Sequence, residues 1–356
     1  MTTGNYNTAS ARNEKIKTRS WLVFFVFFVL LFLLVIYYFS EIKKEFILLE
    51  KVNPYWLIAA VAGQFMTYFF TALIYLFLLK LYKIPRLPRR WDLLKASVIS
   101  LLFNQTVPSA GISGNTFYVN FLSRFNISGT VIISIILGEL LVFYAAMEMI
   151  IVSLLIACLL MYKSFYAFKA TLVAGIIIYL VFGLAVAFAG KKDNLNRLYE
   201  KIINTRFIKK IFNNINKEIT ESTNSEKGIQ LLTLLKNNKP IVINIFLFQL
   251  LVVAADAFTL YVLFLGLGYP VAAFIVLLAL ISTKIISIIP FLPGALLLYE
   301  SSMSFFFATA GVPVGTAIIV TLVYRLLSFW LPMPFGTLLY RKWLVTAPAD
   351  KIISPS

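Results

Sequence analysis

Proline and glycine interrupt two long apolar stretches of the chain. The sequence reads PFLPG at residues 290–294 and NQTVPSAGISG at residues 104–114, and isolated charged residues follow both breaks. A lipid bilayer admits non-helical backbone only where protein or a water-filled cavity surrounds it. Paired breaks in the two halves of a membrane chain therefore indicate a transport site.

The composition around these breaks is that of an integral membrane protein. Of the 356 residues, 60% are hydrophobic and only 13% are charged, whereas a soluble domain carries about 25% charged residues. The mean hydropathy is +0.88, and apolar runs reach the roughly 20 residues that a spanning helix needs. The sequence therefore predicts an all-α, polytopic helix bundle. The first run, residues 21–39, lacks a small-residue cleavage site and exceeds the about 7–15 residues of a signal peptide's apolar region, so we interpret it as a retained helix.

The charge and the rare residue types narrow the chemistry. The net charge is +17, but the basic residues lie in short segments between apolar runs, where they set orientation and attract an anionic inner leaflet. We therefore expect no nucleic-acid partner. Histidine is absent and Cys158 is the single cysteine, which removes imidazole catalysis and thiolate metal clusters. The sequence also holds no P-loop motif and no nucleophile elbow. It predicts no cofactor and no metal.

The basic segments predict the topology. Segments rich in Lys and Arg precede the first helix and follow every second helix, which places both chain ends in the cytoplasm. We divide the chain into a cytoplasmic segment 1–20, a transmembrane region 21–343 and a cytoplasmic tail 344–356. The predicted spans are residues 21–39, 54–80, 130–162, 168–190, 241–266 and 314–340.

Two further apolar pairs surround the breaks. Residues 92–125 must enter and return on the cytoplasmic side, and their arms of about 12–16 residues are short for a span of about 20. Residues 270–289 and 294–310 form a second pair, which we predict to enter from outside. Six spans and two opposed re-entrant hairpins make an inverted repeat, a geometry of alternating access. Because 270–289 is long enough to span, eight spans remain an alternative.

The polar stretch 191–239 separates the two halves. Apolar residues recur there at helical spacing, with Lys and Arg between them. We predict an amphipathic helix on the inner membrane face rather than a folded domain.

Ionisable residues within the apolar runs are the candidate functional groups, because each costs at least about 2.5–3.5 kcal/mol at the bilayer centre. One interpretation is a polar cavity that accepts a charged headgroup. The other is structural, with Glu300 paired to Arg325. Glu139 and Arg124 would pair in the same way. The full set is Arg124, Glu139, Glu148, Asp256, Lys284, Glu300 and Arg325.

The breaks themselves add candidates. Their glycines could serve only tight turns or close helix approach. Broken helices, however, present backbone N–H groups, and helix N-termini near Gly114 and Gly294 would favour a phosphate. Arg325, Arg124 or Lys284 would supply the counter-charge. The predicted substrate-binding residues are Asn104, Pro108, Gly111, Gly114, Arg124, Glu139, Lys284, Pro293, Gly294, Glu300 and Arg325.

The second break resembles a known signature. PGALLLYE at residues 293–300 resembles the P-G-G-L-G-x-x-E pattern of the lysylphosphatidylglycerol synthase transmembrane family, the flippase-like domain, with Ala295 and Leu297 in place of two glycines. Leu140 stands where family members often carry an arginine. Further matching positions are Gly311-Val312-Pro313, Ala317 and Tyr324-Arg325, and in the first half Asn104, Pro108, Gly111, Gly114, Arg124, Asn126-Ile127-Ser128 and Glu139.

The resemblance implies a bacterial or archaeal plasma-membrane protein that moves a phospholipid, such as lysylphosphatidylglycerol, between leaflets. In full-length relatives a soluble C-terminal domain makes that lipid, and because this sequence ends at Ser356 we expect no synthase domain and no enzymatic activity. The expected partners are membrane phospholipid, the anionic inner leaflet, a second copy of the chain in a homodimer, and a separate lipid-modifying enzyme. Two alternatives stay open: a secondary transporter of a small anion, and a non-transporting scaffold for a lipid-modifying or glycosyl-transferring enzyme.

Overall fold

The computed structural model describes residues 54–84, 87–106, 112–125, 127–161, 166–190, 231–288, 295 and 297–345. The chain divides into two compact units, Met1–Lys51 and Val52–Ser356, and every described residue belongs to the second. The predicted first helix, most of the predicted amphipathic segment, and the sequences 107–111 and 289–294 at the two breaks lie outside the described residues.

Five helices in the described part are long and apolar enough to cross a membrane. Their ends lie within a few residues of the predicted ends, so the prediction of a polytopic helix bundle is confirmed. The sidedness inferred from charge stays a prediction. The five are α2 (Pro54–Leu81), α5 (Gly129–Leu160), α6 (Tyr166–Ala189), α11 (Lys239–Gly266) and the segment Val314–Leu344.

The last of these segments is not a uniform helix. It consists of α14 (Val314–Arg325), the π-helical turn η2 (Leu326–Trp330) and α15 (Pro332–Val345). Within the turn, the amide of Leu331 donates to the carbonyl of Leu326, five residues back, at 2.7 Å. Pro332 has no amide hydrogen, so the ordinary four-residue ladder cannot continue through it. Single π turns of this kind occur mostly at functional sites.

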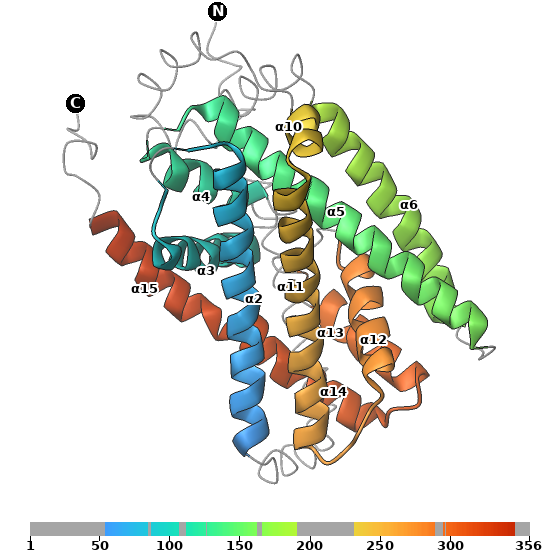
Figure 1. Ribbon diagram of the computed structural model, residues 1–356. Coiled ribbons are helices and arrows are strands. Elements are labelled where there is room, and N and C mark those ends of the chain that lie inside the picture. The colour runs from blue at the N-terminus through green and yellow to red at the C-terminus, as the bar shows by residue number, and fades with distance from the viewer. Residues whose placement is uncertain are drawn as a thin grey trace, which may run out of the picture. The chain divides into compact units, whose positions relative to one another are not determined.

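Four shorter helices form the two predicted pairs. α3 (Arg90–Thr106) packs on α4 (Ile112–Ser123), and α12 (Ala273–Ile286) packs on α13 (Leu298–Thr309). α12 has 14 residues, about 21 Å at 1.5 Å per residue, against a hydrocarbon core of about 30 Å. Because residues 289–294 lie outside the described residues, the choice between six and eight spans stays a prediction. Figure 1 places α3 and α4 towards the upper end of α2, whereas α12 begins near the lower end of α11.

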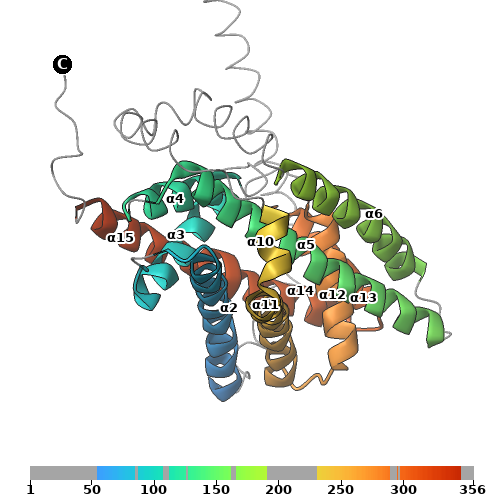
Figure 2. The ribbon, with the colours of Figure 1, turned by 45° about the horizontal axis from the view of Figure 1, so that its top comes forward.

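The two 28-residue helices α2 and α11 run side by side and antiparallel (Figures 1 and 2). Thr259 approaches the carbonyl of Ala60, and Asp256 approaches Thr67, so residue numbers fall on α11 as they rise on α2. A Cβ atom at Gly63 would lie 2.6 Å from the Thr259 hydroxyl oxygen. The crossing therefore requires a residue without a side chain at this point.

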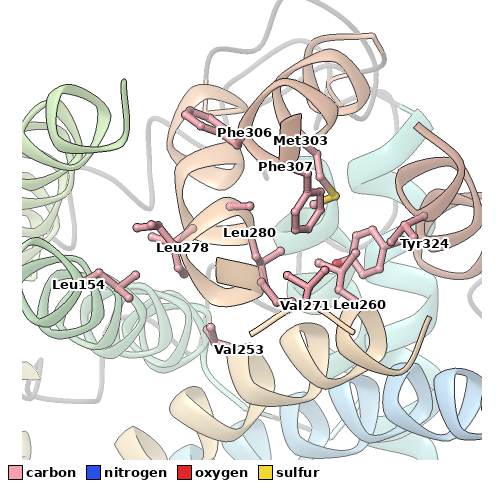
Figure 3. Close-up of a cluster of buried hydrophobic side chains, with 14 of the residues drawn as sticks. Leu154, Val253, Leu260, Val271, Leu278, Leu280, Met303, Phe306, Phe307 and Tyr324 are labelled. Atoms are coloured by element: carbon pink, nitrogen blue, oxygen red, sulfur yellow. The ribbon is translucent and has the colours of Figure 1, made fainter. Parts of the chain in front are cut away.

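Buried apolar side chains form two clusters. One joins α2 to α5 and α11. The other joins α5, α6 and α11 to α12, α13 and α14, and Figure 3 shows Leu280, Phe307 and Tyr324 of this cluster converging from three helices. The short helix α10 (Leu231–Asn237), at the end of the predicted amphipathic segment, also enters the core, since Leu231 is fully buried beside Gly138. The second cluster surrounds the charged residues described next.

Candidate functional site

Glu300 and Arg325 form a buried ion pair between α13 and α14. The Nε atom of Arg325 donates to Oε1 of Glu300 at 2.5 Å. The guanidinium also lies over two rings, 4.7 Å from the centroid of Tyr299 and 4.4 Å from that of Phe329. Arg325 is only 7% exposed. The expected pairing of these two charges is observed, and aromatic rings stabilise the cation further.

A second ion pair links three helices. Nζ of Lys284 on α12 lies 2.8 Å from Oδ2 of Asp256 on α11. The other carboxylate oxygen of Asp256 accepts a hydrogen bond from the Thr67 hydroxyl on α2 at 3.2 Å. Asp256 is buried. This carboxylate therefore ties the first half of the chain to the second.

Tyr299 stands between the two pairs. Its ring stacks on that of Tyr324 with centroids 6.3 Å apart. The Tyr299 hydroxyl also lies within electrostatic reach of Lys284, Asp256 and Arg325. We call Thr67, Asp256, Lys284, Tyr299, Glu300, Tyr324 and Arg325 the central polar cluster.

The central polar cluster is formally neutral, with two cations and two carboxylates in apolar surroundings. Each cation is held by a carboxylate that an anionic ligand could replace, since phosphate and carboxylate bind guanidinium and ammonium groups in similar ways. The second carboxylate oxygen of Glu300 is buried and has no hydrogen-bond partner in the described structure. Unpartnered buried oxygens are costly, so Glu300 is the member of the cluster whose surroundings are least complete.

Asn104 and Gly114, in the first hairpin, hold α3 close to the start of α4 rather than contributing to the central polar cluster. Oδ1 of Asn104 accepts a hydrogen bond from the backbone amide of Gly114 at 2.8 Å, at the start of α4. A Cβ atom at Gly114 would lie 2.5 Å from both the Asn104 amide nitrogen and the Ser100 hydroxyl. The proximity supports the interpretation that Gly114 permits close helix approach. Pro108 and Gly111 lie outside the described residues.

The structure does not bring Glu139 and Arg124 together. Arg124 is exposed at the end of α4, where its guanidinium lies 3.4 Å from the ring centroid of Trp343. Glu139 lies half-buried on α5, near the stacked rings of Tyr75 and Tyr118. Among the described residues, neither charge makes an ion pair or hydrogen bond with the central polar cluster.

The backbone before Glu300 follows a path suited to glycine. Ala295 has a φ angle of +52° and Leu297 one of +67°, in a region that side chains disfavour. These are the two positions at which the resembling signature carries glycine. Their backbone conformation explains why glycine suits the signature there, and it leaves this chain with local strain. Pro293 and Gly294 lie outside the described residues.

Several contacts of the site have no signal in the sequence that predicts them. Thr67, Tyr299 and Tyr324 carry no charge, and their place in the cluster follows only from the packing of three helices. Gln105, at the end of α3, donates from Nε2 to the backbone carbonyl of Ser328 in η2 at 3.0 Å. The one available signal was Pro332, which deprives that carbonyl of its α-helical donor.

Comparison with known proteins gives two matches. Residues 20–336, nearly the whole chain, match the family described as lysylphosphatidylglycerol synthase TM region. A UPF0104 membrane protein of Pyrococcus horikoshii is 33% identical over 104 residues, which cover 28% of this chain and 31% of that protein. The second match thus spans less than a third of the relative's length.

Proposed function

Since the chain belongs to the lysylphosphatidylglycerol synthase TM-region family, we propose that it moves a phospholipid between the two leaflets of a membrane. A role connected with membrane lipids agrees with this family. The chain is a multi-pass membrane protein, and we place it in the plasma membrane with both ends in the cytoplasm.

The buried Arg325–Glu300 pair carries the proposal. A guanidinium at 7% exposure within an apolar bundle needs a counter-ion at all times. In the resting state Glu300 fills that need. In our mechanism a lipid phosphate takes the place of Glu300 at Arg325, and Glu300 accepts a cationic part of the headgroup.

Lys284 is the second cation of the central polar cluster. Because Asp256 holds it at 2.8 Å, a phosphate would have to compete with a carboxylate that Thr67 also orients. We therefore assign first contact with the lipid to Arg325. We assign Glu139, which has no cationic partner among the described residues, to the headgroup amine of an aminoacylated lipid. The two hairpins would expose the cluster to each side in turn while the acyl chains stay in the bilayer.

Reconstitution into liposomes with fluorescent phospholipids of different headgroups tests the proposal. Wild type should move at least one lipid above background, and Arg325→Ala should not. Arg325→Lys keeps the charge but not the planar fork, and it should retain part of the rate if the protein elutes as a folded species.

Lys95→Ala is the matched control, because it breaks the exposed Lys95–Asp92 pair, whose side chains are 54% and 39% exposed. It should leave the rate unchanged. Equal, background-level movement by wild type and Arg325→Ala for every lipid would refute the proposal. Uptake of inorganic phosphate by wild type without lipid movement would instead support a small-anion transporter.

A further inference from the structure

The end of the first hairpin is fastened to the helix that carries Arg325. Gln105 is the penultimate residue of α3, and its Nε2 atom donates to the backbone carbonyl of Ser328, 223 positions later in the sequence. Gln105 is 7% exposed. The contact therefore joins the two halves of the chain in a place shielded from solvent.

The acceptor in this bond is a carbonyl that the sequence itself leaves without its ordinary donor. In an α-helix the carbonyl of Ser328 would receive the amide hydrogen of residue 332. That residue is Pro332, which has none. The amide of Gln105 supplies a hydrogen bond to this carbonyl, and it does so at the π-helical turn.

The nitrogen of the Gln105 side-chain amide has a hydrogen-bond partner, and its oxygen has none in the described structure. Its nitrogen donates to Ser328, whereas its oxygen Oε1 is buried with no hydrogen-bond partner in the described structure. Opening the contact would let water reach both groups, and hydration of Oε1 would offset much of the lost bond. A contact with this balance is suited to forming and breaking repeatedly.

The contact also lies next to the central polar cluster. Phe329 follows Ser328 directly, and its ring lies 4.4 Å from the guanidinium carbon of Arg325. Arg325 is the last residue of α14, immediately before η2. A movement of α3 that pulls on Ser328 would therefore shift a ring that positions Arg325.

We propose that the hydrogen bond from Gln105 to the Ser328 carbonyl is a latch that fastens the end of α3 to η2, beside the Arg325–Glu300 pair, and that it must open in each transport cycle. The inference rests on the proposed function for its role in transport. The opening of this hydrogen bond and its effect on η2 can be measured without a transport assay.

Cross-linking tests the role in transport. In a Cys158→Ala background, which has no other cysteine, Gln105→Cys and Ser328→Cys would be joined by a short thiol-specific cross-linker and the product identified by mass spectrometry. The cross-linked protein should move lipid about tenfold more slowly or worse, and reduction should restore the rate. The control pair is Ser97→Cys with Tyr118→Cys, whose hydroxyls lie 2.8 Å apart within the first hairpin. That cross-link should leave the rate largely intact.

Hydrogen exchange tests the latch independently. Gln105→Met preserves the length of the side chain but has no donor, and it should raise amide exchange in residues 326–331. Gln64→Met is the control, because Gln64 is equally buried but bonds within its own helix. Its exchange in 326–331 should match wild type.

Two results would overturn the latch. One is unchanged exchange in Gln105→Met, and the other is full transport by the cross-linked protein. If wild type itself moves no lipid, the proposed function fails, and the exchange measurement still decides whether the latch exists.

Discussion

Removing the carboxylate of Asp256 should destabilise the protein by about 3 kcal/mol, because it leaves the ammonium of Lys284 inside the bundle without a counter-ion. The two charges are 2.8 Å apart, and the side chains are 7% exposed for Asp256 and 26% for Lys284. Loss of one partner of a fully buried pair costs about 3–5 kcal/mol. The partial exposure of Lys284 places the expected value at the lower end of that range.

A double-mutant cycle measures the coupling energy between Asp256 and Lys284. Lys284→Ala alone should also cost about 3 kcal/mol, whereas the double variant Asp256→Ala/Lys284→Ala should cost about the same as either single variant, since no unpaired charge remains. The coupling energy is then about 3 kcal/mol. The same cycle on the exposed pair Asp92–Lys95 should give less than about 1 kcal/mol.

The assay is reversible unfolding in detergent micelles by increasing SDS, followed by tryptophan fluorescence. If the two single effects add, so that the double variant loses about 6 kcal/mol, the two residues act independently. That result would refute the reasoning that the pair stabilises the bundle through mutual charge compensation.

Other predictions follow from individual contacts. Gly63→Ala should cost about 1–3 kcal/mol in the same SDS unfolding assay, because its Cβ would lie 2.6 Å from a hydroxyl of α11, and Gly183→Ala, with ordinary 3.5 Å clearance, should be neutral. Asn104→Ala should lower stability by about 1 kcal/mol through loss of its hydrogen bond to the start of α4. Leu297→Gly should raise the melting temperature by relieving a backbone strain of about 1–3 kcal/mol, and an unchanged or lower value would show that the strain is absorbed elsewhere. Arg124→Ala should leave lipid movement near the wild-type rate, because this exposed cation stacks on the half-buried ring of Trp343 and makes no ion pair with the central polar cluster, and a drop to background would contradict that assignment.

The helices and the charged candidates of the second half were predictable from sequence. Apolar runs of spanning length have few alternatives in a bilayer. Charges within such runs must be compensated, so Glu300 and Arg325 stood out as candidates, and their pairing was one of the two interpretations that the sequence left open. Asp256 and Lys284 were recognised as ionisable candidates for the same reason.

Pairing across distant helices was not predictable. Whether Lys284 meets Asp256 or a lipid phosphate depends on how α12 packs against α11. No local sequence pattern predicts the rotation of α12 about its axis in that packing. For the same reason the expected contact of Glu139 with Arg124 did not form: Arg124 found an aromatic surface of α15 instead. The π-helical turn could have been suspected from Pro332, but its partner Gln105 could not.

The antiparallel packing of α2 on α11 has a consequence for biosynthesis. Thr67 meets Asp256 across 189 positions of sequence, and Gly63 lies against Thr259 and Phe258 of α11. At about 5–20 residues per second, roughly 10–40 s of translation separate the two helices. During that interval the face of α2 that contains Gly63 and Thr67 is in the membrane without α11. The α2–α11 crossing therefore forms late in synthesis, and variants at this crossing should show reduced membrane yield before they show altered transport.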